Sequence, residues 1–201
     1  MISLALTLLL QAASPTVLTG ERPPAALADL PNLTVTYYVV SGDDPQAVRR
    51  SMNERRTRDP IDGKPYDART DVSYRYRAPA RADGTGCDPA AAVFTHAIRM
   101  TLPKLAEPTR LKPAERLDWE RYMTQLVAHE RNHALIGLRG GIELEKRFKA
   151  APDCKLAKAA ADAGSAAMAA AHLQYDAKTQ HGVLEGAVYP PRRAAPARRG
   201  R

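Results

Sequence analysis

The chain is poor in aromatic residues and cysteine. Aromatic residues make up 5% of its 201 residues, with one Trp and two Phe, so we expect a core of aliphatic side chains, Tyr and close helix contacts. Hydrophobic and charged residues account for 44% and 26%, as in soluble globular proteins. These fractions exclude a collagen-like, a wholly disordered or a polytopic membrane protein. No repeat of solenoid length is present, and the length predicts one domain with a single core.

Only two cysteines are present, Cys87 and Cys154, and neither belongs to a C-x-x-C pair. Their spacing excludes the common zinc-ribbon and thioredoxin-like motifs. In an exported protein we expect the two to form a disulfide, which would stabilise the fold by about 4 kcal/mol on the chain-entropy model. The alternative is a pair of buried free thiols in a cytoplasmic protein.

The apolar run at residues 2–10 is too short to span a bilayer but has the length of a signal-peptide core. We therefore predict a signal peptide or leader over residues 1–20 and an exported protein, periplasmic or extracellular. The pattern is incomplete because no Lys or Arg precedes the run. The alternative is a buried N-terminal strand or helix.

The basic character of the chain is concentrated at its C-terminal end. The net charge is +8, and subtracting five arginines of the last ten residues leaves +3 for the rest. A segment rich in Pro, Ala and Arg buries too little apolar surface to offset its ordering entropy. We predict a disordered basic tail over residues 190–201, with at most weak contact with anionic envelope polymers, and no binding of nucleic acid. The five are Arg192, Arg193, Arg198, Arg199 and Arg201.

Strand patterns come first along the chain and helix patterns follow. We predict strands at residues 33–40, 72–77 and 93–102, a short helix at 46–56, a helical region from 113 to about 150 and an Ala-rich helix from 155 to about 180. The second helical region is one long helix or two, and in the second case Gly140 and Gly141 mark the break, since Gly destabilises a helix interior. This order predicts an α+β fold over residues 21–189, with an antiparallel sheet and helices on one side.

The second helical region contains the motif H-E-x-x-H at residues 129–133. His129 and His133 are four residues apart, so they project from one helix face and could share one zinc ion. Glu130 is then placed to act as general base on a water at the metal. The two histidines fall on an apolar stripe with Leu126 and Ile136, and the alternative is a pair of hydrogen-bonded core histidines.

A catalytic zinc needs a third protein ligand. The extended metzincin pattern is absent, because Ile136 and Arg139 occupy the positions of its Gly and third His. A histidine that ends a helix, His181, is the favoured candidate, with Tyr175 and Asp176 nearby as outer-shell or oxyanion-stabilising groups. Weaker candidates for the site are His96, His172, Glu143, Glu145, Asp153 and Asp162.

The H-E-x-x-H helix is preceded by Trp119 and Tyr122 and followed by Y-D-x-x-T-x-H-G at residues 175–182. In these motifs the chain resembles a bacterial family of predicted secreted zinc-dependent proteases, formally a domain of unknown function. The resemblance covers residues 33–187. It implies a zincin-like fold, metal binding by His129, His133 and His181, and catalysis by Glu130.

Together these observations predict a secreted or periplasmic metallopeptidase that hydrolyses an amide bond of a peptide or protein substrate. Its cofactor is expected to be Zn²⁺, with Glu130 activating a zinc-bound water. By analogy with zincins, we expect the strand at 93–102 to lie at the sheet edge and hold an extended substrate. The alternative is a non-catalytic periplasmic domain that binds zinc or interacts with the envelope.

Overall fold

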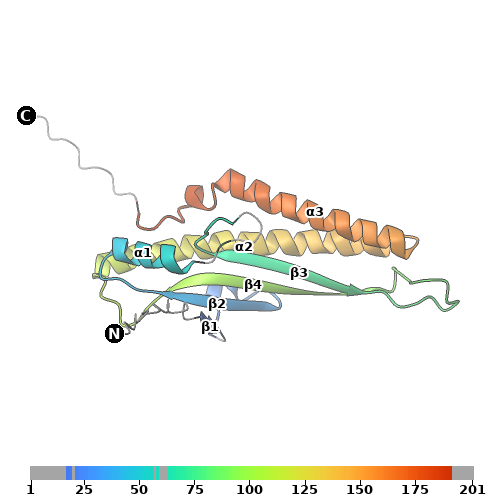
Figure 1. Cartoon of the computed structure of the whole chain (residues 1–201), viewed down its shortest axis with the longest axis horizontal. Helices are drawn as coiled ribbons and strands as arrows, with labels where there is room; N and C mark the ends of the chain where they lie inside the picture. Colours follow the sequence, from blue (N-terminus) through green and yellow to red (C-terminus); the bar gives the residue numbers. More distant parts are fainter. Residues whose placement is uncertain (1–16, 20, 57, 59–62, 192–201) are drawn as a thin grey trace, which may run out of the picture.

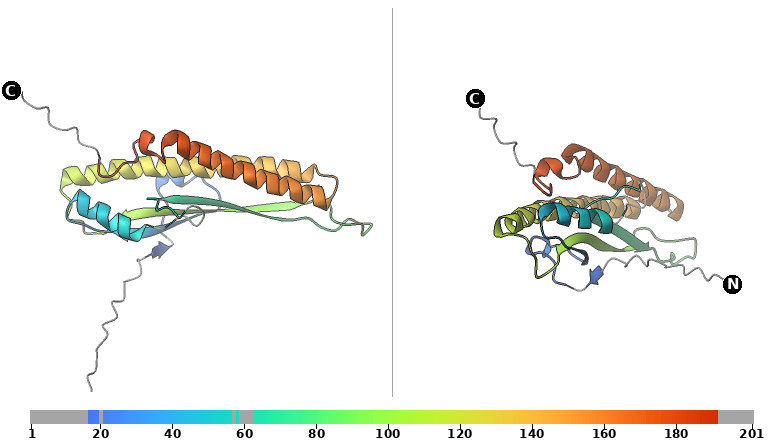
Figure 2. Two further views of the ribbon diagram at one scale, coloured as in Figure 1. Left: turned by 45° about the horizontal axis from the view of Figure 1, so that its top comes forward. Right: turned by 60° about the vertical axis from the view of Figure 1, so that its left-hand side comes forward.

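The elements of the protein form three layers, with α2 between the β-sheet and α3 (Figure 1). A second pair of views agrees with this arrangement, and shows α1 beside one end of α2 (Figure 2). The computed structural model describes residues 17–19, 21–56, 58 and 63–191. In chain order the elements are β1 (Val17–Thr19), η1 (Ala25–Leu27), β2 (Leu33–Val40), α1 (Pro45–Arg55), β3 (Arg69–Arg77), β4 (Val93–Leu105), α2 (Pro113–Lys149), α3 (Cys154–Thr179) and η2 (Val183–Glu185).

The α+β class is confirmed, and each strand and helix predicted from the sequence is present. Asp44 begins α1 by accepting a hydrogen bond from the Ala47 N–H, and Asp153 begins α3 in the same way through the Leu156 N–H. The last residues of the predicted leader include β1, which pairs with β2. Residues 1–16 of that leader and residues 192–201 of the predicted tail lie outside the described residues.

The prediction of an antiparallel sheet is wrong for one strand pair. The strand order is β1-β2-β4-β3, and β2 runs parallel to β4, whereas β3 and β4 are antiparallel. The chain between β2 and β4 contains α1 and β3, which is long enough for the crossover that a parallel pair needs. Period-two alternation gives the faces of a strand but not its direction. Because β4 lies between β2 and β3 from Ile98 onward, the expected substrate edge is wrong for residues 98–102; β3 forms that edge of the sheet.

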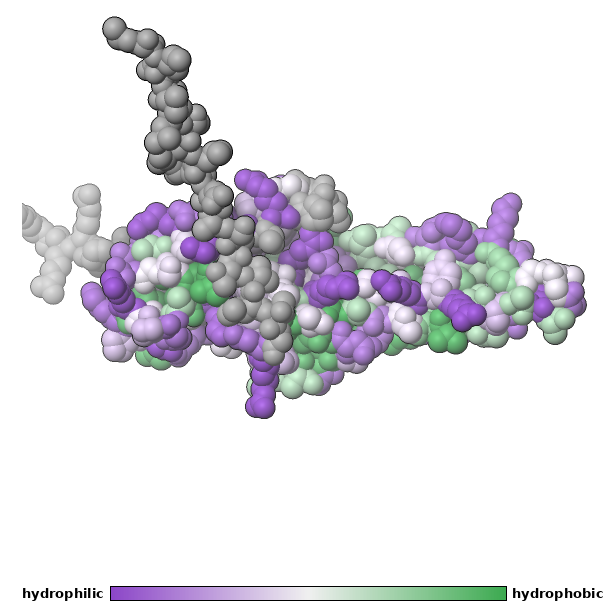
Figure 3. All heavy atoms as spheres, turned by 60° about the horizontal axis from the view of Figure 1, so that its bottom comes forward, coloured by the Kyte–Doolittle hydropathy of each residue, from purple (hydrophilic) through white to green (hydrophobic). Residues whose placement is uncertain are grey.

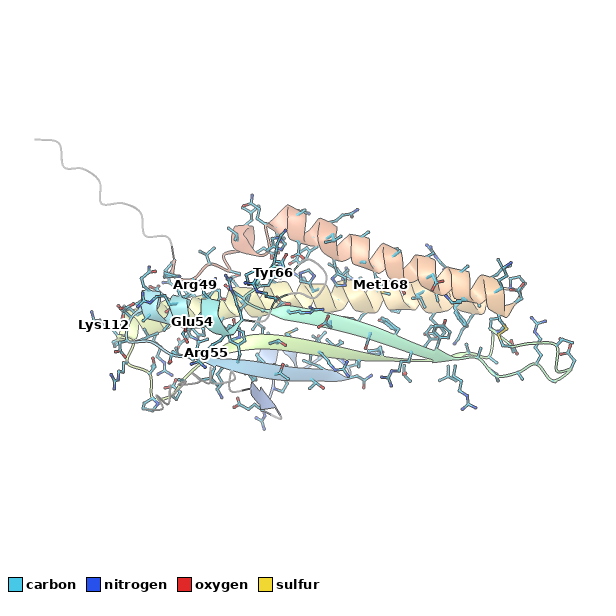
Figure 4. All side chains as sticks on the ribbon, viewed as in Figure 1. Arg49, Glu54, Arg55, Tyr66, Lys112 and Met168 are labelled. Carbon is cyan, nitrogen blue, oxygen red and sulfur yellow. A yellow bond between two sulfur atoms is a disulfide. The ribbon has the colours of Figure 1, made fainter. Side chains whose placement is uncertain are left out.

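Of the two alternatives for this region, the structure has the single long helix, because α2 continues through Gly140 and Gly141. Small residues allow close contact between layers here. A Cβ atom at Gly140 would lie 2.1 Å from the Cγ atom of Met168 in α3, which is labelled in Figure 4. One turn earlier, a Cβ atom at Gly137 would lie 2.5 Å from Cγ2 of Val72 in β3. The glycines therefore set the distances of α2 from α3 and from the sheet.

The main core lies between the sheet, α1 and the first half of α2. At its edge Asp67, in the segment before β3, accepts hydrogen bonds from Arg49, Arg56 and Tyr122. Arg49 lies on α1 (Figure 4), and both of its terminal guanidinium nitrogens donate to Asp67. The network joins the start of β3 to α1 and α2, close to the H-E-x-x-H motif.

The predicted disulfide between Cys87 and Cys154 is confirmed. Cys87 lies in the connection between β3 and β4, and Cys154 is the first residue of α3. Arg81 of the same connection donates hydrogen bonds to the carbonyl groups of Cys87 and Pro152. The sheet and the helical layers are thus covalently joined at one end of the molecule.

We expect a variant carrying Cys87→Ser and Cys154→Ser to have a free energy of unfolding about 4 kcal/mol lower than the oxidised protein. The disulfide restricts the unfolded chain across a sequence separation of 67 residues, and this restriction is lost in the variant. Urea denaturation followed by circular dichroism measures the difference. An unchanged transition midpoint would contradict the assignment of this stabilising role.

On the sheet side of the molecule, hydrophilic side chains are interspersed with smaller hydrophobic areas (Figure 3). Of the helices in the described part of the chain, none is both long and apolar enough to cross a membrane.

Candidate metal centre

The H-E-x-x-H residues lie in the middle of α2, on the part of the helix that is enclosed by β3 and α3. His129 and His133 are 4% and 8% exposed. One helical turn separates them, and their Nε2 atoms are 3.2 Å apart. The sequence prediction that the two rings converge on one point is therefore met by the structure.

The carboxylate of Asp176, from the last turn of α3, lies against both rings. Its Oδ1 atom is 3.1 Å from His133 Nε2 and 3.3 Å from His129 Nε2. Burial raises the pKa of Asp176, but hydrogen bonds from the two histidines outweigh it and hold this pKa below its usual value. Burial lowers the pKa of His129, but hydrogen bonds to Asp176 and Glu185 outweigh burial. The pKa of His129 is therefore above its usual value.

The separations among these three atoms lie within 0.2 Å of the range expected around a zinc ion. Bonds of 2.0–2.2 Å in a tetrahedral site place neighbouring ligand atoms about 3.3–3.6 Å apart, and the three atoms here are separated by 3.1–3.3 Å. His129, His133 and Asp176 are also the described residues that can bring three ligand atoms within 4.8 Å of one another. We call these three side chains the metal triad.

Glu130 lies beside the metal triad, and a residue of the sheet fixes the position of its carboxylate. It is 4% exposed, and the Thr70 hydroxyl of β3 donates a 2.6 Å hydrogen bond to its Oε2 atom. Burial raises the pKa of Glu130, and the nearby His133 and the hydrogen bond from Thr70 offset part of that rise. The carboxylate is thus oriented by the edge strand of the sheet.

Glu185 of η2 contacts the outer side of His129. Its Oε2 atom is 2.7 Å from Nδ1 of His129, and Tyr175 donates a 2.8 Å hydrogen bond to its Oε1 atom. The hydroxyl of Tyr175 in turn accepts a hydrogen bond from Asn132. The structure places the Tyr175 hydroxyl in this network, and its ring stacks on His129. Burial raises the pKa of Tyr175 to about 12.

His172 and His181 both lie near the metal triad. The Nδ1 atoms of His172 and His133 are 2.9 Å apart, and burial with the neighbouring His133 lowers the pKa of His172. His181 places its Nδ1 atom 3.4 Å from Oδ1 of Asp176 and is half exposed. A continuous helix would turn these two histidines away from each other, but α3 ends at Thr179 and the next residues are left-handed. His181 as the third ligand stays a prediction.

Outside the metal triad, His181 is flanked by Tyr66, whose ring centroid is 5.0 Å away. Tyr66 lies below the C-terminal end of α3 in Figure 4. His96 is instead in the sheet, near Tyr74 and Asn32. The acidic residues considered from the sequence, Glu143, Glu145, Asp153 and Asp162, are absent from the group of ligand atoms found among the described residues.

Two contacts of the candidate site were not predicted from the sequence, those of Thr70 with Glu130 and of Glu185 with His129. Thr70 stands just before the strand predicted at residues 72–77, and nothing in its local sequence indicates that it contacts Glu130. Glu185 stands in a short segment between two glycines and has no motif around it. Both contacts join elements far apart in the sequence, so local patterns could not reveal them.

A comparison with family models matches residues 35–182 to the family described as "Bacterial protein of unknown function (DUF922)". The matched region covers about three quarters of the chain. The chain belongs to the DUF922 family. No curated protein and no solved structure matches it.

The DUF922 region contains the whole metal triad together with Glu130 and His181, but it ends before Glu185. The predicted membership of a bacterial family of unknown function is thereby confirmed. The description of DUF922 contains no protease activity.

Proposed function

We propose that this protein is an exported zinc-dependent metallopeptidase whose ion is bound by His129, His133 and Asp176. The observation that carries the proposal is the triangle formed by the two Nε2 atoms and Oδ1 of Asp176, with sides of 3.1–3.3 Å. Three protein ligands leave one position open, which is typical of catalytic rather than structural zinc sites.

The adjacent carboxylate supports a hydrolytic role for this centre. A zinc ion, when bound, supplies a Lewis acid that polarises a carbonyl group and makes water more acidic. Glu130 would accept the proton of the attacking water and deliver it to the leaving amine. The hydrogen bond from Thr70 keeps the Glu130 carboxylate in one orientation during this transfer.

The compartment is part of the proposal. Disulfides persist in oxidising environments, and the Cys87–Cys154 bridge in a chain of a bacterial family is compatible with export to the periplasm or beyond. The substrate class is a peptide or protein, because the proposed chemistry is the attack of water on an amide carbonyl.

Metal analysis of the purified chain tests the centre. We expect about one zinc per wild-type chain, loss of zinc in His129→Ala and Asp176→Ala, and retention in His181→Ala. Elemental analysis of identically purified proteins measures this. Retention in Asp176→Ala with loss in His181→Ala would instead assign the third ligand to His181. Loss in both would indicate a site closed by four protein ligands, as in the non-catalytic alternative.

A well-folded wild-type chain that takes up no zinc, even after incubation with the ion, would overturn the proposal. Circular dichroism of each variant shows whether a loss of metal reflects unfolding. Because Asp176 and His181 lie in the same short segment, each serves as the matched control for the other.

A further inference from the structure

Glu185 makes a directed contact with one ring of the metal triad. Imidazole has two nitrogen atoms, and a carboxylate that accepts a hydrogen bond from one of them requires a proton there. Glu185 contacts Nδ1 of His129 at 2.7 Å, on the side of the ring away from Asp176. With the proton held on Nδ1, a bound ion would replace the proton on Nε2, and the lone pair of Nε2 would then point into the triad.

The position of Glu185 is itself fixed by other side chains. Tyr175 donates to both carboxylate oxygens, at 2.8 and 3.0 Å, and Asn132 donates to the Tyr175 hydroxyl. The segment before Glu185 approaches His129 closely, since a Cβ atom at Gly182 would lie 3.2 Å from Cγ of that ring. Gly182 has a φ angle of 81°, which favours glycine and turns the chain back toward α2.

The second histidine of the triad has a different partner. Nδ1 of His133 faces Nδ1 of His172 at 2.9 Å, so an imidazole occupies the place that a carboxylate takes beside His129. Hydrogen bonds to a charged acceptor are shorter and stronger than those to a neutral one. Of the two outer partners, Glu185 therefore constrains its histidine more strongly.

We propose that Glu185 is a positioning residue of the metal centre, which holds His129 in the orientation and tautomer that bind the ion. This inference rests on the proposed metal site and adds a residue beyond the region matched to DUF922. Asn132 and Tyr175 act through Glu185, by fixing the direction of its carboxylate.

Zinc affinity, measured by competition with a chromogenic chelator, tests the role of Glu185. We expect Glu185→Ala to bind zinc about 10–100-fold more weakly than the wild type. We expect a smaller loss in Glu185→Gln, because the amide oxygen can still accept from Nδ1. The matched control is Glu143→Gln on the exposed side of α2, which should leave the affinity unchanged.

The ring proton of His129 gives a second, spectroscopic readout. In the zinc-loaded wild type, ¹⁵N-edited spectra should show a downfield Nδ1–H signal of His129 that exchanges slowly with water. The signal should be absent in Glu185→Ala and present in Glu143→Gln. An unchanged zinc affinity and an unchanged Nδ1–H signal in both Glu185 variants would overturn the positioning role. If the wild type still binds zinc in that case, the proposed metal site is supported without a role for Glu185. A wild type without zinc would overturn the site itself.

Discussion

Replacing Glu130 by Gln should leave zinc binding intact and lower the rate of amide hydrolysis by about 10²–10⁴-fold. The amide has nearly the shape of the carboxylate and can still accept the hydrogen bond from Thr70, so the fold and the metal triad should be preserved. Gln cannot take the proton of the attacking water. Cleavage of a mixed peptide library, followed by mass spectrometry, measures the rate.

Glu143→Gln makes the same chemical change at an exposed position of the same helix and should cleave the library at the wild-type rate. Equal rates for Glu130→Gln and the wild type would remove Glu130 from the mechanism. Loss of zinc from Glu130→Gln would show that the carboxylate holds the metal centre together rather than moving a proton.

Replacing Gly137 by Ala should lower the free energy of unfolding by about 1–3 kcal/mol, although Ala favours a helix more than Gly does. The added methyl group would lie 2.5 Å from Cγ2 and 2.7 Å from Cβ of Val72. Valine has little freedom to rotate, so α2 and β3 would have to separate. Urea denaturation measures the change.

The exposed neighbour Ile142 provides the control, because Ile142→Ala introduces the same residue in the same helix and should change stability by less than about 0.5 kcal/mol. Adding Val72→Ala to Gly137→Ala should reduce the cost of the glycine replacement, since part of the contact is removed. A Gly137→Ala protein as stable as the wild type would show that α2 and β3 can move apart without a measurable loss of stability.

Local sequence patterns were sufficient for the elements and for the pair of histidines. Alternation over β3 and β4 and the four-residue spacing of His129 and His133 are properties of neighbouring residues. The parallel pairing of β2 with β4 depends on how the chain returns across the sheet, which periodicity does not record. The two glycines of α2 are explained by Met168 and Val72, which occupy the space beside Gly140 and Gly137.

The part of the candidate site that lies on α2 was predictable from the sequence. Glu130, His129 and His133 were all found from a five-residue motif. The place of Asp176 depends on the register between α2 and α3, and the left-handed residues after Thr179 decide where His181 lies. These are tertiary properties, so the prediction of His181 as the third ligand and of Asp176 as an outer-shell group was made without them.

The metal triad spans two antiparallel helices, and binding of the proposed ion would therefore be linked to the pairing of these helices. The disulfide joins the start of α3 to the connection between β3 and β4, while His129, His133 and Asp176 lie near the other end of α3. An ion bound only when the helices are paired adds its binding free energy to their association, about 2.7 kcal/mol at one hundred times the dissociation constant. Removal of the ion by a chelator should therefore speed up amide hydrogen exchange first at the C-terminal end of α3. Exchange at the Cys154 end should change less, because the disulfide still holds that end in place.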